Sequence, residues 1–273
     1  RGYLRFVRDR VSRLFRKGWD SGVYSRYCCV SSPNLSGTTD FSRREGGCLS
    51  SFDDQAQFID AVLNGYDVPK IEAELMVVQS SGKPRPLTKF SSLDFLLQPL
   101  HKSIYDRISG TSWLCRGDPT SEKLKKAGFR KGAGILVSGD YQSATDNLPI
   151  EVAEVIMQTI LANSVSVPDS VKEHALKILR PSLFNLDYDM EFCPTRGQMM
   201  GSYLSFPLLC LQNFLCFEWA RMEQGLDRMP ILINGDDILF QSEDINFPET
   251  WMGVVEGLGL KVEKSKTSVS FDY

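Results

Sequence analysis

Two adjacent carboxylates lie between two short apolar runs near the end of the chain. Residues 234–237 read Asn-Gly-Asp-Asp, with apolar residues at 230–233 before them and at 238–240 after them. Apolar runs on either side of an Asn-Gly pair predict a tight hairpin, here with both carboxylates at its tip. Their charge is costly unless a cation neutralises it, and Mg²⁺ takes oxygen ligands from one or two carboxylates. From these residues alone, an exposed Asp-Asp turn without a metal is the alternative.

A second pair of carboxylates lies upstream. The run Ile135–Val137 predicts a buried strand that ends at Asp140, and Asp146 precedes a helix expected over Pro149–Leu161. Because neighbouring strands lie about 4.8 Å apart, Asp140 can face Asp236 across a gap the size of a metal ion. Two metals about 3.5–4 Å apart would activate one oxygen and stabilise another during displacement at phosphorus. A helix cap is the alternative for Asp146.

The two hairpin carboxylates are not expected to act alike. Asp236 and Asp237 are consecutive, so alternation along a strand should point their side chains in different directions. We therefore assign the primary metal-binding role to Asp236 and a peripheral role to Asp237.

Displacement at phosphorus also requires cations that hold the phosphates. Lys83, Arg85 and Lys89 supply them in a segment whose prolines preclude a helix and keep it extended, and Arg is suited to bidentate phosphate contacts. A lysine after the last expected strand, Lys264 or Lys266, could donate a proton to leaving pyrophosphate. An ordinary charged surface is the alternative for all five residues.

Polar residues in and after a glycine-containing loop could contact a sugar or a template. The loop 196–202 holds Gly197 and Gly201, which let the backbone approach a ligand closely. Ser202 and Ser205 offer hydroxyl groups, and Asn213 offers an amide. The apolar residues of the surrounding helix are assigned to core packing.

The remaining patterns predict the elements that position these residues. Helices are expected near 53–65, 93–108, 120–127, 149–161, 168–179, 204–222 and 249–258. Strands are expected at 73–78, 135–137, the two arms of the 230–240 hairpin and 260–262, with a strand or hairpin at 184–192. This order favours an α+β fold, with a small antiparallel sheet and helices on one face.

Bulk properties narrow the class of protein. The chain has 273 residues and a net charge of −3, so total charge argues neither for nor against a polyanionic partner. No stretch of about 20 apolar residues predicts a membrane span. Seven cysteines and two histidines, with no Cys-x-x-Cys, disfavour a zinc site. The odd cysteine count suits a reducing compartment better than a disulfide framework.

The first 17 residues are strongly basic. Residues Arg1–Lys17 contain seven Arg and Lys residues and a single acid, Asp9. The apolar residues between these charges follow a helical period. Contact with RNA or a membrane surface, a targeting-like role and a solvated helix packed on the core all remain open. Because the chain begins with Arg1, we expect a fragment or a processed product.

In their order along the chain, these motifs resemble the palm and fingers of viral RNA-dependent RNA polymerases. The resemblance rests on Lys83-Pro84-Arg85, Asp140-x5-Asp146, Gly201-Ser202 before a helix, and Gly235-Asp236-Asp237. The local sequences are similar to those of the ourmia-like (botourmiavirus) polymerases of plants and fungi, with narnaviruses and mitoviruses as neighbouring groups. The similar segments are Ser138-Gly139-Asp140, Ser143-Ala144-Thr145-Asp146-Asn147, Met200-Gly201-Ser202 and Ser205-Phe206-Pro207-Leu208. The resemblance covers roughly Leu75–Thr267 and is specific as an ordered set.

The resemblance implies a role for each candidate residue. Asp140, Asp236 and Asp237 would bind Mg²⁺ or Mn²⁺. Asp146 would accept a hydrogen bond from the ribose 2′-hydroxyl, the group that distinguishes RNA from DNA. Nucleotide contacts would come from Lys83, Arg85, Lys89, Ser202 and Ser205, and Lys264 would be the general acid. Many positive-strand polymerases carry an Asn eight residues after the loop glycine, a position that is Leu209 here. Asn213 lies one helical turn further on.

The resemblance also implies a function and a domain organisation. Two-metal nucleotidyl transfer would copy template RNA into product RNA from ribonucleoside triphosphates, replicating a positive-strand viral genome in the host cytoplasm or in the mitochondrion. The expected domains are an N-terminal extension of the fingers (1–72), fingers with the basic arm (73–133), palm (134–164), a fingers insertion (165–197) and palm (198–273), with the thumb largely missing.

Two alternatives remain. The chain could be an inactive, RNA-binding polymerase fragment. It could also be a reverse transcriptase, although that class usually has an aromatic residue near the first carboxylate motif and an aromatic-x pair before Asp-Asp. Here Asp146-Asn147 and Asn234-Gly235 stand at those positions.

Overall fold

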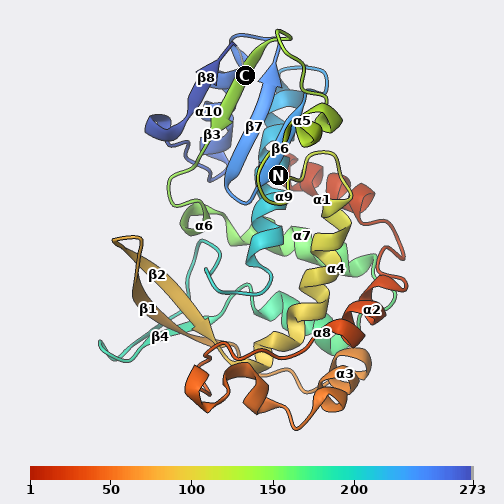
Figure 1. The fold of residues 1–273 in the computed structure, drawn as a ribbon, viewed down its shortest axis with the longest axis vertical. Helices are drawn as coiled ribbons and strands as arrows, with labels where there is room; N and C mark the ends of the chain where they lie inside the picture. Colours follow the sequence, from red (N-terminus) through yellow and green to blue (C-terminus); the bar gives the residue numbers. More distant parts are fainter. Residues whose placement is uncertain (272–273) are drawn as a thin grey trace.

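Helices separate two small sheets in the computed structural model, which describes residues 1–271 (Figure 1). Within these residues, one four-stranded sheet has the order β6-β7-β3-β8 and the other has the order β2-β1-β4-β5. The expected α+β class is therefore confirmed.

The first sheet is antiparallel and carries the carboxylate motifs at one end of its central strands. Its strands are β3 (Ile135–Gly139), β6 (Ile231–Asn234), β7 (Asp237–Ser242) and β8 (Ser268–Ser270). Gly139 of β3 pairs with Ile238 of β7. Extending this register by one residue sets Asp140 opposite Asp237, because positions add to a constant across an antiparallel pair.

Aromatic side chains join this sheet to two helices. Phe240 of β7 packs edge-on against Phe247 and Trp251 of α10 (Phe247–Gly257), and its ring centroid lies 5.0 Å from that of Phe217 in α9 (Ser205–Glu223). Since these large side chains are fully buried, they fix the sheet against both helices and hold the strand ends in place.

The second sheet displays the basic segment on an edge strand. β1 (Glu72–Ser80) pairs with β2 (Lys83–Phe90) through the turn Ser81-Gly82, in which both residues have positive φ, the pattern of a type I′ turn. Parallel pairing joins β1 to β4 (Ser182–Asn185), and β5 (Met190–Phe192) pairs with β4 as the predicted hairpin. The prolines of β2 lack an N–H group and suit an edge position.

The basic N-terminal segment forms α1 (Gly2–Leu14), which packs on the core. Val7 and Val11 are fully buried, and the helix contacts α7 (Ile150–Ala162) and α9. None of the helices in residues 1–271 has the length and apolar character needed to cross a membrane.

The other helices pack around this core, with α5 beside the β6-β7-β3-β8 sheet (Figure 1). They are α2 (Val23–Val30), α3 (Gln55–Asn64), α4 (Gln98–Ser109), α5 (Ser121–Ala127), α6 (Ala144–Asn147) and α8 (Asp169–Lys177), with 3₁₀ turns at Arg43–Glu45, Gly47–Ser51, Ser92–Leu97 and Lys264–Lys266. The predicted helices near 53–65, 120–127, 149–161, 168–179, 204–222 and 249–258 are thus confirmed.

Two expectations need correction. The helix predicted over 93–108 begins as a 3₁₀ turn and becomes α-helical only at Gln98, next to Pro99, a residue favoured at the start of a helix. The predicted last strand, 260–262, is an isolated bridge between Val262 and Tyr141. This segment runs antiparallel to the residues just after β3, and the C-terminal strand that pairs with β3 itself is β8.

Candidate metal and nucleotide site

The carboxylate hairpin has a two-residue loop. Asn234 pairs with Asp237, so Gly235 and Asp236 form the turn between β6 and β7. Gly235 has a φ of 62°, and Asp236 is not among the residues with positive φ, which is the pattern of a type II′ turn. The predicted tight hairpin is confirmed, but its loop is Gly-Asp rather than Asn-Gly. A Cβ atom at Gly235 would lie 3.0 Å from the ring of Phe206, so glycine also meets a steric need.

Three carboxylates converge at this turn. Asp140, Asp236 and Asp237 each present an oxygen, and the three oxygens lie within 4.8 Å of one another. The expected divergence of Asp236 and Asp237 is wrong because Asp236 lies in the loop, where strand alternation does not apply. Both side chains therefore reach the end of β3.

The cluster carries more negative charge than its surroundings neutralise. Burial raises the pKa of Asp236, and the Asp140 carboxylate raises it further. Burial and the two neighbouring carboxylates also raise the pKa of Asp237. The Nζ atom of Lys266 lies 3.4 Å from Asp140 Oδ2 and offsets part of this charge. Converging carboxylate oxygens that repel one another fit a hard divalent cation such as Mg²⁺.

A buried network from α9 fixes the turn. Asn213 is fully buried, and its Nδ2 donates to the carbonyl oxygens of Gly235 at 3.0 Å and Asp237 at 3.4 Å. Its Oδ1 accepts from the Tyr141 hydroxyl at 2.8 Å, and the Tyr141 N–H donates to Asp140 Oδ1 at 2.8 Å. Asn213 was expected to contact the nucleotide, but the structure places its amide inside the protein, where it links the first carboxylate motif to the second.

A groove of about 500 Å³ lies beside the cluster, between β2, α6 and the 194–200 loop. It gathers three of the predicted nucleotide-binding residues, Lys83, Arg85 and Asp146, and Lys266 joins it to Asp140. Arg196 also lines the groove. Arg196 belongs to the glycine-containing loop 196–202 but was not among the predicted site residues, although a cation next to Gly197 was a usable signal.

The other candidates lie elsewhere. Lys89 pairs with Glu74 across the β1–β2 hairpin at 3.2 Å. Ser202 and Ser205 line a small neighbouring cavity that shares Gln198 and Met199 with the groove, and Ser205 Oγ accepts from Gln198 Nε2 at 3.3 Å. Lys264 is exposed in the 3₁₀ turn Lys264–Lys266, so the structure brings Lys266 rather than Lys264 to the cluster.

Sequence comparisons agree with these motifs. The family model for mitovirus RNA-dependent RNA polymerase matches residues 74–273. An RNA-dependent RNA polymerase of Ourmia melon virus is 32% identical over 168 residues, covering 53% of this chain and 19% of that protein. An RNA-directed RNA polymerase of Cryphonectria parasitica mitovirus 1 is 30% identical over 138 residues, covering 49% of this chain and 16% of that protein. The match thus spans less than a fifth of each relative.

Removal of the buried amide should loosen the turn. We expect Asn213→Ala to lower the free energy of unfolding by about 2–4 kcal/mol, because it leaves buried carbonyl oxygens and a buried hydroxyl unpaired. Tyr141→Phe, which removes one hydroxyl, should cost about 1–3 kcal/mol. Urea unfolding measures both, and Mn²⁺ titration should show weaker binding in Asn213→Ala. Unchanged Mn²⁺ affinity in a folded Asn213→Ala protein would contradict the positioning role.

Neutralising a carboxylate should stabilise the metal-free fold. A carboxyl whose pKa is raised by folding favours the folded state below its unfolded pKa and loses that contribution as pH rises through its folded pKa. Asp236→Asn should therefore raise the free energy of unfolding at neutral pH by about 1 kcal/mol, with the gain vanishing near pH 4. Urea unfolding in EDTA at both pH values measures this difference. A loss of stability at neutral pH would show that the three charges are already neutralised by the protein.

Proposed function

The chain belongs to the mitovirus RNA-dependent RNA polymerase family, and from this premise we propose that it catalyses RNA-templated RNA synthesis. The observation that carries the proposal is the convergence of Asp140, Asp236 and Asp237 beside a groove lined with cations. Its substrates would be ribonucleoside triphosphates and a template RNA, here a positive-strand viral genome. The two relatives are named for this reaction.

The cluster would act as the metal centre. Divalent cations, Mg²⁺ or Mn²⁺, would supply charge neutralisation at the reacting phosphate and a more acidic attacking hydroxyl. The contribution of the chain is to hold Asp140, Asp236 and Asp237 together before metal and substrate arrive. Because the fold already holds the three carboxylates close together, the site would need little rearrangement to bind cations.

The groove would hold the incoming nucleotide. Lys83, Arg85 and Arg196 would bind and orient the triphosphate, since guanidinium groups match phosphate oxygens in bidentate contacts. Asp146 would accept a hydrogen bond from the ribose 2′-hydroxyl. For proton donation to leaving pyrophosphate, we propose Lys266 over Lys264 because Lys266 lines the groove and contacts Asp140.

The domain roles follow from these assignments. We propose that the β6-β7-β3-β8 sheet with α9 and α10 is the palm, and that the β2-β1-β4-β5 sheet belongs to the fingers. Residues 1–72 would extend the fingers. We further propose that replication takes place in the host cytoplasm or in the mitochondrion.

A primer-extension assay tests the proposal. With Mg²⁺, template RNA and labelled ribonucleotide, we expect Asp236→Ala to reduce incorporation at least about 10³-fold, because it removes a metal ligand. Glu243→Ala is the matched control, since Glu243 is an exposed carboxylate just beyond the opposite end of β7. Equal activity in Asp236→Ala and wild type would rule out the assigned centre. RNA binding without any incorporation by wild type would instead favour an inactive RNA-binding protein.

Sugar discrimination tests Asp146 separately. Loss of a hydrogen bond to a charged acceptor costs about 1.5–3 kcal/mol, so Asp146→Ala should lower the preference for ATP over dATP by about 10- to 100-fold. The ratio of the two kcat/KM values measures it. Asp187→Ala, which removes an exposed carboxylate between β4 and β5, should leave the ratio unchanged. An unchanged ratio in Asp146→Ala would reject the assigned role, and a ratio that already favours dATP in wild type would favour a reverse transcriptase.

A further inference from the structure

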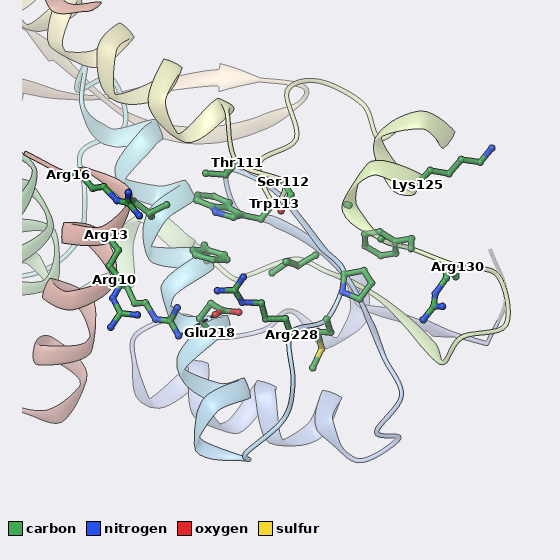
Figure 2. A pocket seen from close by; sticks show the side chains of 18 residues that line it. Arg10, Arg13, Arg16, Thr111, Ser112, Trp113, Lys125, Arg130, Glu218 and Arg228 are labelled. Atoms are coloured by element: carbon green, nitrogen blue, oxygen red, sulfur yellow. Dashed lines mark ion pairs between the residues drawn. The ribbon is translucent and has the colours of Figure 1, made fainter. Parts of the chain in front are cut away.

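A second groove, of about 1100 Å³, shares no lining residue with the groove beside Asp146. It is lined by the end of α1 and the residues after it, the segment 111–113 after α4, the segment 125–130, Phe214 and Glu218 of α9, and the segment 228–231 that leads into β6. Figure 2 shows Arg10, Arg13 and Arg16 at one end, Lys125 and Arg130 at the other, and Arg228 between them.

Positive charge dominates this groove although the chain has a net charge of −3. Among the described residues that line it, Glu218 is the one acid and six are cationic: Arg10, Arg13, Arg16, Lys125, Arg130 and Arg228. Glu218 is itself bound by Arg221 through two hydrogen bonds, at 2.8 and 3.0 Å. Asp9 pairs with Arg13, and Arg10 lies 3.9 Å from Glu218.

The cationic surface has a defined limit. Asp227, Glu243 and Asp244 line a neighbouring hollow that shares Arg130 and Arg228 with this groove. Because these three acids line the hollow and not the groove, a polyanion would be attracted along the groove, from Arg16 through Arg228 to Arg130. These three side chains belong to exposed residues.

The floor of the groove is aromatic and apolar. The rings of Trp113 and Phe214 stack with centroids 4.2 Å apart and an interplanar angle of 4°. Trp113 and Phe129 are buried, so the apolar surface that remains open in the groove comes mainly from the half-buried Phe214, Met229 and Pro230. A ligand with anionic groups at its edge and flat apolar groups at its centre matches this combination. Single-stranded nucleic acids are bound in this way, with phosphates on cations and bases on aromatic rings.

We propose that this second groove binds single-stranded RNA. The proposal rests on the proposed function only for the identity of that RNA as template or product. Five of the six cations are arginines, whose planar guanidinium groups pair with phosphate and stack on bases. Duplex RNA would offer the floor no exposed bases, and an acidic peptide would offer it no regular row of flat rings.

The position of the groove links it to the catalytic turn. Ile231 lines the groove and begins β6, and the turn with Asp236 follows the end of that strand. At about 3.3 Å per residue, β6 spans about 13 Å. RNA bound in this groove would therefore lie within a few nucleotides of the template or product RNA at the catalytic turn.

Labelled RNA of about 16 nucleotides tests the proposal by fluorescence anisotropy over a range of salt concentrations. The variant Arg16→Gln/Arg130→Gln/Arg228→Gln removes three groove cations. The control Arg5→Gln/Arg8→Gln/Arg43→Gln removes three exposed cations outside the groove, two of them on α1. We expect the groove variant to bind single-stranded RNA at least about tenfold more weakly and its salt slope to fall by about 2, at about 0.7 per phosphate contact. The control should match wild type.

Crosslinking and competition complete the test. Photoreactive uridine in the RNA should crosslink to peptides that contain Trp113 or Phe214, identified by mass spectrometry. Equal weakening in both triple variants, crosslinks confined to the groove of Arg85, or equal competition by duplex RNA or polyglutamate of the same charge would each overturn the proposal. Primer extension separates the two claims. Crosslinks at Trp113 without incorporation would reject the proposed function alone, and incorporation without these crosslinks would reject the second RNA site alone.

Discussion

Three negative charges brought within a few ångströms of one another are the feature on which the rest of the structure depends. In water their mutual repulsion would separate them, and in the fold burial and the neighbouring carboxylates raise the pKa of Asp236 and Asp237. The antiparallel register between β3 and β7 brings Asp140 opposite Asp237, and the two-residue turn adds Asp236. Buried aromatic contacts to α9 and α10 resist relaxation of the sheet, and Asn213 of α9 holds the turn by donating a hydrogen bond to the Gly235 carbonyl oxygen. Folding free energy from the core thus opposes an electrostatic cost at the site.

Sequence reasoning found the carboxylates because adjacent apolar and turn-forming residues report local structure. The hairpin at 231–242, the strand before Asp140 and most helices follow from periodicity and turn residues. The sequence predicted a tight hairpin at the Asn-Gly pair, one residue before the observed Gly-Asp loop, because Asn-Gly is the stronger local signal. The register between β6 and β7 and the close approach of Phe206 to Gly235 set the observed loop. Only tertiary packing decides between such alternatives.

The residues that could not be predicted are those whose role depends on distant contacts. Asn213 lies on an apolar helix, and nothing nearby in sequence indicates that its amide joins Tyr141 to Gly235. Lys266 and Lys264 are two residues apart and chemically identical, so only the path of the chain after α10 distinguishes them. Neither the basic rim nor the aromatic floor of the second groove is continuous in sequence, because its lining comes from five separated segments.

The prolines of β2 have a consequence for how the molecule behaves among other copies of itself. An exposed edge strand normally invites pairing with a strand from another chain. Pro84 and Pro86 interrupt the row of N–H donors at the outer edge of the β2-β1-β4-β5 sheet, so a second copy cannot extend it by regular strand addition. The segment that carries Lys83 and Arg85 therefore also blocks strand addition at its own edge of the sheet, which keeps these cations open to solvent.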